Sequence, residues 1–81
     1  MQIHFYGRIS DRLGRSIEID VPASISTVAD LRSLLAKTFP DHAGEIVSPT
    51  LRPCVRDEIV GEAHDIRGAD SVEFFPPLSG G

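Results

Sequence analysis

The chain has 81 residues, of which 41% are hydrophobic and 25% charged, and its formal net charge is −4 at pH 7. This length suits one domain, and the acidic charge argues against nucleic acid as the main partner, because phosphate binding requires a basic patch. No apolar run approaches the roughly 20 residues that cross a bilayer, and Met1 leads directly into strand-like sequence rather than a secretory signal, so we expect a cytoplasmic protein that does not bind membranes.

Residues 1–21 have the pattern of a β-hairpin. Apolar and polar residues alternate over 1–9 and again over 16–21, and this period of two is typical of half-buried strands. The polar segment 10–14 between them contains a glycine and predicts a turn that can include one helical turn. The two strands should therefore pair in antiparallel fashion, and Pro22 ends the second one.

Residues 27–39 have the periodicity of an amphipathic helix. Thr27 is a good N-cap, and Asp30, three residues later, completes a short capping box. The apolar stripe predicted to be buried consists of Val28, Leu31, Leu34, Leu35 and Phe39. The positions predicted to face solvent are Arg32, Ser33 and Lys37. A proline ends the helix after Phe39, because the residue before proline avoids the α region.

A polar connection leads to three further strands. Segments 50–55 and 58–60 flank the turn Arg56-Asp57, and residues 71–75 form the last strand. Pro53 confines the first of the three to a sheet edge or to a register in which its N–H would point outward. One helix then covers one face of a mixed sheet of about five strands, which is an α+β class. The first and last strands can pair in parallel through the long crossover, and that arrangement is the ubiquitin-like β-grasp.

The reactive residue types form no catalytic or metal-binding pattern. Cys54 is the only cysteine, so we expect a small core side chain rather than a sulfur relay. His4, His42 and His64 lie far apart in sequence, and we predict no metal site. Tyr6 is expected to be an ordinary half-exposed strand aromatic. With no Ser/His/Asp or Cys/His constellation and no glycine-rich phosphate loop, the chain is not expected to be an enzyme by itself.

The end of the chain is its most informative stretch. Its sequence is Phe74-Phe75-Pro76-Pro77-Leu78-Ser79-Gly80-Gly81. The two aromatics point to opposite faces of the last strand, so one should join the core while the other is a candidate interface anchor. The prolines stop the strand, because proline has no N–H and a fixed φ. The sequence thus predicts a β-grasp domain over 1–75 and a flexible tail over 76–81 that presents the Gly81 carboxylate.

This ending resembles the C-terminal signature of the small subunit of molybdopterin synthase, a sulfur carrier. The resemblance extends over the whole chain, and the segments similar to the family's first strand and turn, helix start and central hairpin are 3–8 with 13–14, 27–31 and 55–60. Three features depart from the family pattern. The family commonly has a basic residue near Ser10 that is implicated in partner contact, and that role is not carried over to this chain. Arg56 stands where Asn is common, and Gly68-Ala69-Asp70 stands where the family has Asp-Gly-Asp.

The resemblance implies a cycle of sulfur transfer. An ATP-using enzyme related to ubiquitin activators would adenylate Gly81, sulfur would replace AMP to give a thiocarboxylate, and no cofactor would be bound permanently. Docked on a large catalytic subunit in a two-plus-two assembly, the tail would donate sulfur to a cyclic pterin monophosphate and build the dithiolene of molybdopterin. Gly80 would let the backbone pass through the active-site channel. The residues expected to contact partners are Phe74, Phe75, Pro76, Pro77, Leu78, Ser79 and, from the central hairpin, Ile59.

Three other functions fit the same ending. The chain could carry sulfur for thiazole formation or tRNA thiolation, or it could be a ubiquitin-like modifier joined through Gly81 to lysines of other proteins. It could also be a passive β-grasp interaction module. The Phe-Phe-Pro-Pro run favours the molybdopterin interpretation. A β-grasp ferredoxin is excluded, because an iron–sulfur cluster needs several cysteines.

Overall fold

The structure is a computed structural model that describes residues 1–77. In chain order its elements are β1 (Gln2–Phe5), α1 (Arg8–Leu13), β2 (Ser16–Glu18), α2 (Val28–Thr38), the 3₁₀ helix η1 (Pro40–His42), α3 (Ala43–Ile46), β3 (Arg52–Val55), β4 (Glu58–Ile59) and β5 (Ser71–Phe75). No helix in this part of the chain has the length and apolar character needed to cross a membrane.

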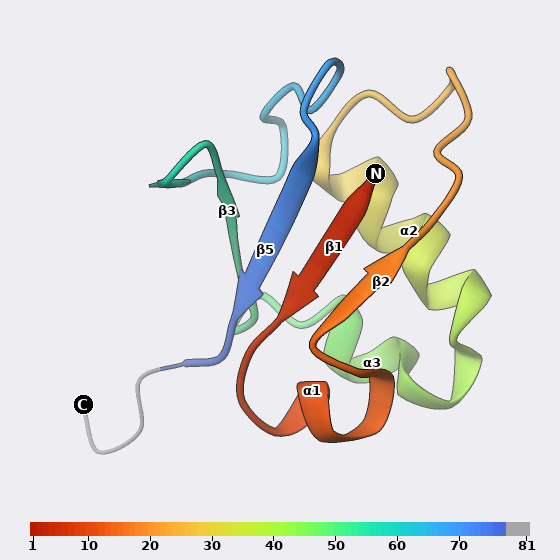
Figure 1. Cartoon of the computed structure of the whole chain (residues 1–81), viewed down its shortest axis with the longest axis vertical. Coiled ribbons are helices and arrows are strands. Elements are labelled where there is room, and N and C mark those ends of the chain that lie inside the picture. Colours follow the sequence, from red (N-terminus) through yellow and green to blue (C-terminus); the bar gives the residue numbers. More distant parts are fainter. Residues whose placement is uncertain (78–81) are drawn as a thin grey trace.

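One five-stranded sheet forms the framework, with strand order β2-β1-β5-β3-β4. β1 and β5 run parallel at its centre, with Ile3 opposite Val72 and Phe5 opposite Phe74, and the other neighbouring pairs are antiparallel. α2 packs across one face of the sheet, behind the strands in Figure 1. The predicted α+β class and ubiquitin-like β-grasp architecture are therefore confirmed.

The core lies between α2 and the two central strands. Phe5 and Phe74 are 1% and 0% exposed, and their rings stack with centroids 5.8 Å apart. Leu31 and Leu35 of α2 cover them from the other side and are fully buried. Burying each such side chain contributes about 1.5–3 kcal/mol to the stability of the fold. The C-terminal end of β5, which carries Phe74, therefore belongs to the most strongly stabilised part of the domain.

The start of α2 is fixed by caps and by a neighbouring loop. Thr27 and Asp30 form the predicted capping box, which is confirmed. The next two free N–H groups are satisfied from outside the helix: Val28 donates to the carbonyl of His64 at 3.1 Å and Ala29 to that of Glu62 at 2.9 Å. Because these donors have no partner within the helix, the loop that follows β4 acts as a second cap.

The first predicted strand is shorter than its alternation indicates. β1 ends at Phe5, and the backbone turns at Gly7, with φ 79° and ψ −155°, into helix α1. Ile9 remains buried at 4% exposure, but from the helix rather than from a strand. The second strand likewise ends at Glu18. A run of only a few residues can fit both the strand period of two and the helix period of 3.6, so alternation alone places the end of the first strand too late.

Pro53 lies inside the sheet, because β3 pairs with both β5 and β4. The predicted edge position is therefore wrong, whereas the outward-pointing alternative fits. The Pro53 carbonyl accepts a hydrogen bond from Val60 at 3.0 Å, and the N and O of one strand residue point to the same side. An N–H on residue 53 would therefore point toward the β4 side of the sheet, beyond the end of β4 at Ile59, so no bond between the strands is lost.

Arg32 does not face solvent, so that prediction is wrong. Arg32 is 4% exposed and lies on the face of α2 that packs against the sheet, not on the outer face of the helix. Arg32 follows Val28 by four residues and precedes Leu35 by three, which places it on the buried stripe of the helix. Leu34, which the sequence predicts to be part of that stripe, is only partly buried.

Candidate functional site

The last strand ends at the edge of the sheet opposite Met1 (Figure 1). There Pro76 and Pro77 line two grooves. The aromatic groove, ≈ 1000 Å³ in volume, is lined beside the prolines by Tyr6, Pro49, Thr50, Arg52, Ile59 and Phe75. The glycine groove, ≈ 590 Å³, is lined beside them by residues that include Gly7, Arg8, Glu45, Ser48, Thr50 and Leu51. Both prolines contribute to both grooves, so the base of the tail is a ridge with a hollow on each side.

Pro76 is seated on the backbone of Gly7. A Cβ placed on Gly7 would lie 2.7 Å from Cγ and 3.0 Å from Cβ of Pro76, closer than packed atoms come. The φ of 79° and ψ of −155° at Gly7 also fall in a region that side chains avoid. Both conditions require glycine. This role was not predicted, although a glycine within an alternating strand pattern is a known sign of close backbone approach.

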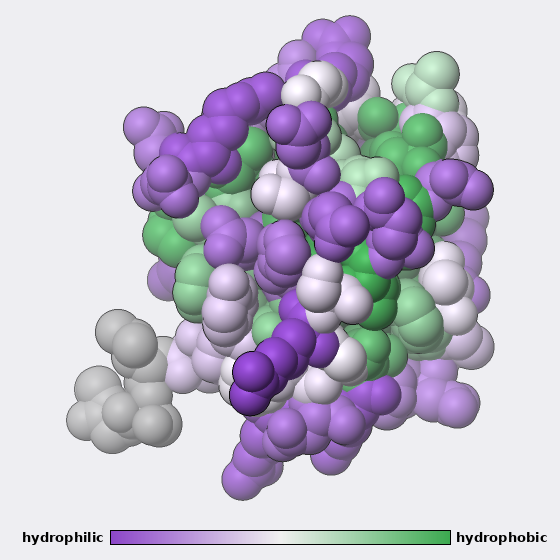
Figure 2. All heavy atoms as spheres, viewed as in Figure 1, coloured by the Kyte–Doolittle hydropathy of each residue, from purple (hydrophilic) through white to green (hydrophobic). Residues whose placement is uncertain are grey.

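An aromatic pair forms the wall of the aromatic groove. Phe75 stacks on Tyr6 with ring centroids 4.6 Å apart and planes 4° from parallel. The Tyr6 hydroxyl donates to Glu73 Oε2 at 3.1 Å, and this bond to a carboxylate raises the pKa of the phenol above its usual range. Tyr6 and Ile59 are 42% and 58% exposed. Figure 2 shows apolar side chains exposed between polar ones over this sheet face. The Tyr6 ring is half-exposed, as expected, and it also supports Phe75.

The structure brings part of the predicted contact set together. Phe75, Pro76, Pro77 and Ile59 all line the aromatic groove, and whether a partner binds there stays a prediction. Of the two consecutive phenylalanines of β5, Phe74 is the one that joins the core. Its side chain has no exposed surface, so the prediction that it contacts a partner is wrong. The remaining members of the set, Leu78, Ser79, Gly80 and Gly81, lie outside the described residues.

Arg32 connects α2 to the segment that walls both grooves. Its guanidinium donates to the carbonyl oxygens of Ile46 and Ser48 at 2.7 and 3.0 Å, and to that of Leu51. It also forms a two-pronged ion pair with Glu62, at 2.7 Å from Nε and 3.1 Å from Nη2. A charge at a stripe position of an amphipathic helix is a signal that this residue has buried partners, and that signal was present in the sequence.

Cys54 is a poor nucleophile in this position. It is 6% exposed, and burial raises the pKa of its thiol, with the nearby Glu73 carboxylate acting in the same direction. Since the thiolate is the reactive form, the structure supports a packing role over a sulfur relay. Within residues 1–77, no three His, Cys, Asp or Glu side chains come together in a way that could hold a metal ion.

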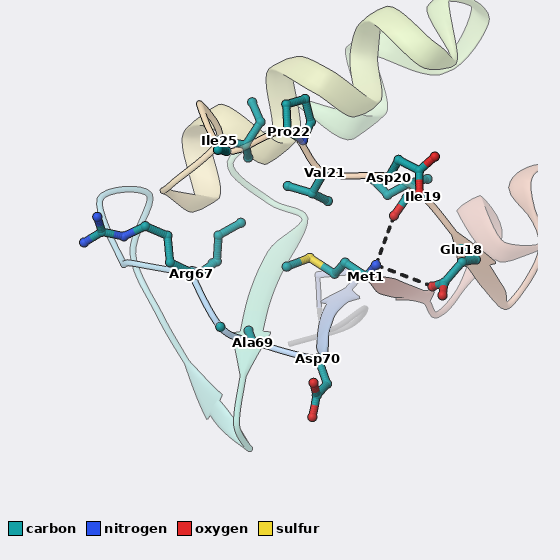
Figure 3. A pocket seen from close by; sticks show the side chains of 13 residues that line it. Met1, Glu18, Ile19, Asp20, Val21, Pro22, Ile25, Arg67, Ala69 and Asp70 are labelled. Carbon is teal, nitrogen blue, oxygen red and sulfur yellow. Dashed lines mark hydrogen bonds and ion pairs between the residues drawn. The ribbon is translucent and has the colours of Figure 1, made fainter.

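A third hollow, of ≈ 650 Å³, lies at the far end of β1 from the tail (Figure 3). The Met1 side chain projects into it, while the Met1 amine donates to the Ile19 carbonyl at 3.0 Å and pairs with Glu18 at 3.6 Å. Arg67 at the rim pairs with Asp65 at 2.8 Å and holds the pKa of that carboxyl at about 2 through this hydrogen bond. None of the predicted site residues that the structure describes lies in this hollow, and the candidate site is the tail base.

Comparison with known proteins gives a family model that matches the chain and a solved structure of similar fold. Residues 3–81 match the sequence model of the ThiS family, so the match extends through the terminal glycines. Among solved structures, SAMP1 from Haloferax volcanii superposes with a TM-score of 0.79 at 20% identity, covering 99% of this chain and 97% of that one. At this identity the likeness shows the shared fold. Comparison with curated protein sequences gives no match.

Proposed function

The chain belongs to the ThiS family, and on that premise we propose that it is a sulfur carrier whose Gly81 carboxylate becomes a thiocarboxylate. The observation that carries the proposal is the base of the tail. A fully buried Phe74 anchors β5, and Pro76 and Pro77 then leave the domain beside an apolar groove. A carrier needs this combination, because its partner must hold the domain while it reaches the terminal carboxylate.

The chemistry requires activation, because a carboxylate is a poor electrophile. Attack of the carboxylate on ATP gives an acyl-adenylate and pyrophosphate, which divides one difficult substitution into two easier ones. Hydrosulfide then attacks the carbonyl carbon, the C–S bond forms, and AMP leaves with the electrons of the broken C–O bond. The partner enzyme supplies ATP and the catalytic groups. The chain is therefore proposed as a non-catalytic substrate and carrier with no permanently bound cofactor.

The residues of the chain serve to present the carboxylate. Gly80 and Gly81 have no side chains to obstruct a narrow channel. Fixing the backbone of each residue on insertion opposes binding by about 1–2 kcal/mol, and Pro76 and Pro77 reduce that loss because their φ is already fixed. The exposed side chain of Ile59 and the half-buried ring of Phe75 are the proposed docking contacts for the partner.

At a finer level, we propose that the carrier is the small subunit of molybdopterin synthase. The Phe-Phe-Pro-Pro-Leu-Ser-Gly-Gly ending supports this assignment. Its partners would be an adenylating enzyme and a large catalytic subunit in a two-plus-two assembly, in the cytoplasm. The acceptor would be a cyclic pterin monophosphate. Sulfur carriage for thiazole or tRNA thiolation and attachment to protein lysines are the competing outcomes of the test.

Intact-mass measurement tests the proposal. After incubation with ATP, sulfide and the cognate adenylating enzyme, replacement of one oxygen by sulfur through the acyl-adenylate should add about 16 Da. A chain that lacks Gly81 is the matched control: it should fold as the full chain does and gain no mass. Conjugates at higher mass would assign the modifier function instead. No mass change with an enzyme active on another carrier would refute both carrier assignments.

A second measurement identifies the pathway. The charged chain is mixed with the large subunit and the cyclic pterin monophosphate, and dithiolene formation is followed together with loss of the added sulfur mass. Transfer to the pterin supports the molybdopterin assignment. A chain that gains sulfur but does not pass it to the pterin would belong to one of the other sulfur pathways.

A further inference from the structure

We propose that Arg32 is a positioning residue that sets the direction in which the tail leaves the domain. The inference rests on the proposed carrier function and concerns how the carboxylate is aimed at the adenylating enzyme. Arg32 touches no part of the reacting group. It acts through the segment 46–51, which walls both grooves, and through Phe74 at the base of the tail.

The guanidinium of Arg32 is the point at which three parts of the fold meet. Its five hydrogen bonds reach the carbonyl oxygens of Ile46, Ser48 and Leu51 and both carboxylate oxygens of Glu62. The side chain is only 5% exposed. A planar fork of donors can meet several acceptors in fixed directions, whereas a lysine ammonium is a single compact centre. The site therefore specifies arginine.

These carbonyl groups belong to the wall beside the tail. Pro49 and Thr50 line the aromatic groove, and Ser48, Thr50 and Leu51 line the glycine groove. The segment has no strand partner until β3 begins at Arg52. Within the segment, Leu51 N–H donates to the Ser48 carbonyl at 3.1 Å, and the Ser48 hydroxyl bonds with Thr50. The bonds from Arg32 are the ones that tie this wall to α2, and losing the guanidinium would remove three of them.

Arg32 also reaches the base of the tail directly. Its guanidinium carbon lies 5.3 Å from the centroid of the Phe74 ring, a cation–π distance. The opposite side of that base is held by the residue that follows β1, because Tyr6 N–H donates to the Phe74 carbonyl at 3.1 Å. Pro76 follows two residues later and rests on Gly7. One side chain thus fixes both the strand from which the tail departs and the wall beside it.

The alternative is a purely stabilising role, and the structure offers a way to separate the two. A buried ion pair is weak evidence for stability, because desolvation offsets the attraction. Glu62 has 51% of its side chain exposed, so much of its hydration is retained. Substituting a purely stabilising residue would lower only the fraction of the chain that is folded. A positioning residue would in addition raise KM for the carrier with kcat unchanged, which is the signature of lost binding in both ground and transition states.

The test uses the full chain as substrate of the adenylating enzyme, with pyrophosphate release as the readout. The variant Arg32→Lys keeps the positive charge but loses the planar set of donors. In Glu62→Ala the guanidinium keeps its hydrogen bonds to the three carbonyl oxygens and loses its ion pair. Val28→Ala is the control, since Val28 is fully buried at the first position of α2 and lines neither groove. The concentration of each variant is corrected for its folded fraction, measured by circular dichroism, so that KM can be determined even for a marginally stable variant.

We expect Arg32→Lys to raise KM about tenfold, and Glu62→Ala about threefold, with kcat within about twofold, because displacing a bound group weakens the productive complex. Val28→Ala should lower stability and leave KM unchanged. The inference is overturned if both variants keep the KM of the parent chain, or if the control raises KM equally. Failure of the parent chain itself to be adenylated would overturn the carrier function, and with it the inference.

Discussion

Replacing Gly7 by alanine is the most direct test of how the tail base is built. The substitution adds one methyl group at a position where φ is 79° and ψ is −155°. That methyl group would lie 2.7 Å from Cγ of Pro76 unless the proline moves. Two separate penalties therefore act at one site, and the chain contains a second glycine that isolates one of them.

The two penalties can be estimated separately. A side chain held in this backbone region costs of order 1–3 kcal/mol. Forcing a methyl group into occupied space costs about 1–3 kcal/mol more. Gly7→Ala should therefore lower the free energy of unfolding by about 2–6 kcal/mol, a large part of the roughly 5–15 kcal/mol typical of a domain. Gly14 has φ 95° and ψ 157°, but a methyl group added there would meet no atom within 4 Å, so Gly14→Ala carries the backbone penalty alone.

Urea unfolding followed by circular dichroism gives both values. Gly7→Ala should lose at least about 1 kcal/mol more than Gly14→Ala. Adding Pro76→Gly to Gly7→Ala should recover the difference, as a coupling energy in a double-mutant cycle. Equal losses for the two alanine variants, with no coupling to Pro76, would show that the proline does not rest on Gly7 and would refute the account of the tail base.

Three further outcomes follow from the structure. Cys54 should react slowly with iodoacetamide in the native chain and quickly in urea, and Cys54→Ala should still gain sulfur; equal rates, or loss of the gain, would contradict its packing role. Arg56 has φ 50°, so Arg56→Asn should raise the free energy of unfolding by up to about 1 kcal/mol, measured in urea, and a loss would contradict the turn assignment. The carboxyl of Asp65 has a pKa of about 2, below its usual 3.8, because Arg67 donates hydrogen bonds to it. Its contribution to stability is therefore present above the usual pKa and is lost as pH falls through the lower one. The urea midpoint of the parent chain should fall between about pH 4 and 2, and in Asp65→Asn the midpoint should fall less over that range. Parallel plots of midpoint against pH for the two chains would contradict this.

Local sequence signals predicted the elements that depend on neighbouring residues. The capping box of Thr27 and Asp30 forms as expected, because both partners lie within one turn of the helix. The Arg56-Asp57 turn forms as well, and both residues have positive φ, 50° and 67°, the conformation of a two-residue hairpin turn. This explains physically why Asn is common at the position of Arg56 in the family that the chain resembles, since Asn tolerates that conformation better.

The features missed from the sequence depend on residues far apart in the chain. The charge of Arg32 predicts a position in solvent, but the carbonyl groups that accept its hydrogen bonds lie 14 to 19 positions away and the Glu62 carboxylate lies 30 away. The alternation places Gly7 in a strand, but its contact is with Pro76. In both cases the local pattern held a sign, a charge on an apolar stripe and a glycine in a strand, without identifying the partner.

A carrier that presents a bare carboxylate has to be recognised mainly at the base of its tail. Gly80 and Gly81 offer a partner no side chains, and ordering each residue's backbone opposes binding by about 1–2 kcal/mol. Burying an exposed apolar side chain returns about 1.5–3 kcal/mol, so Ile59 and the Tyr6–Phe75 pair at the aromatic groove could offset the ordering of several tail residues. That compensation depends on a fixed angle between groove and tail. The buried fork of Arg32 is the contact in the described chain that ties the groove wall to the strand from which the tail departs.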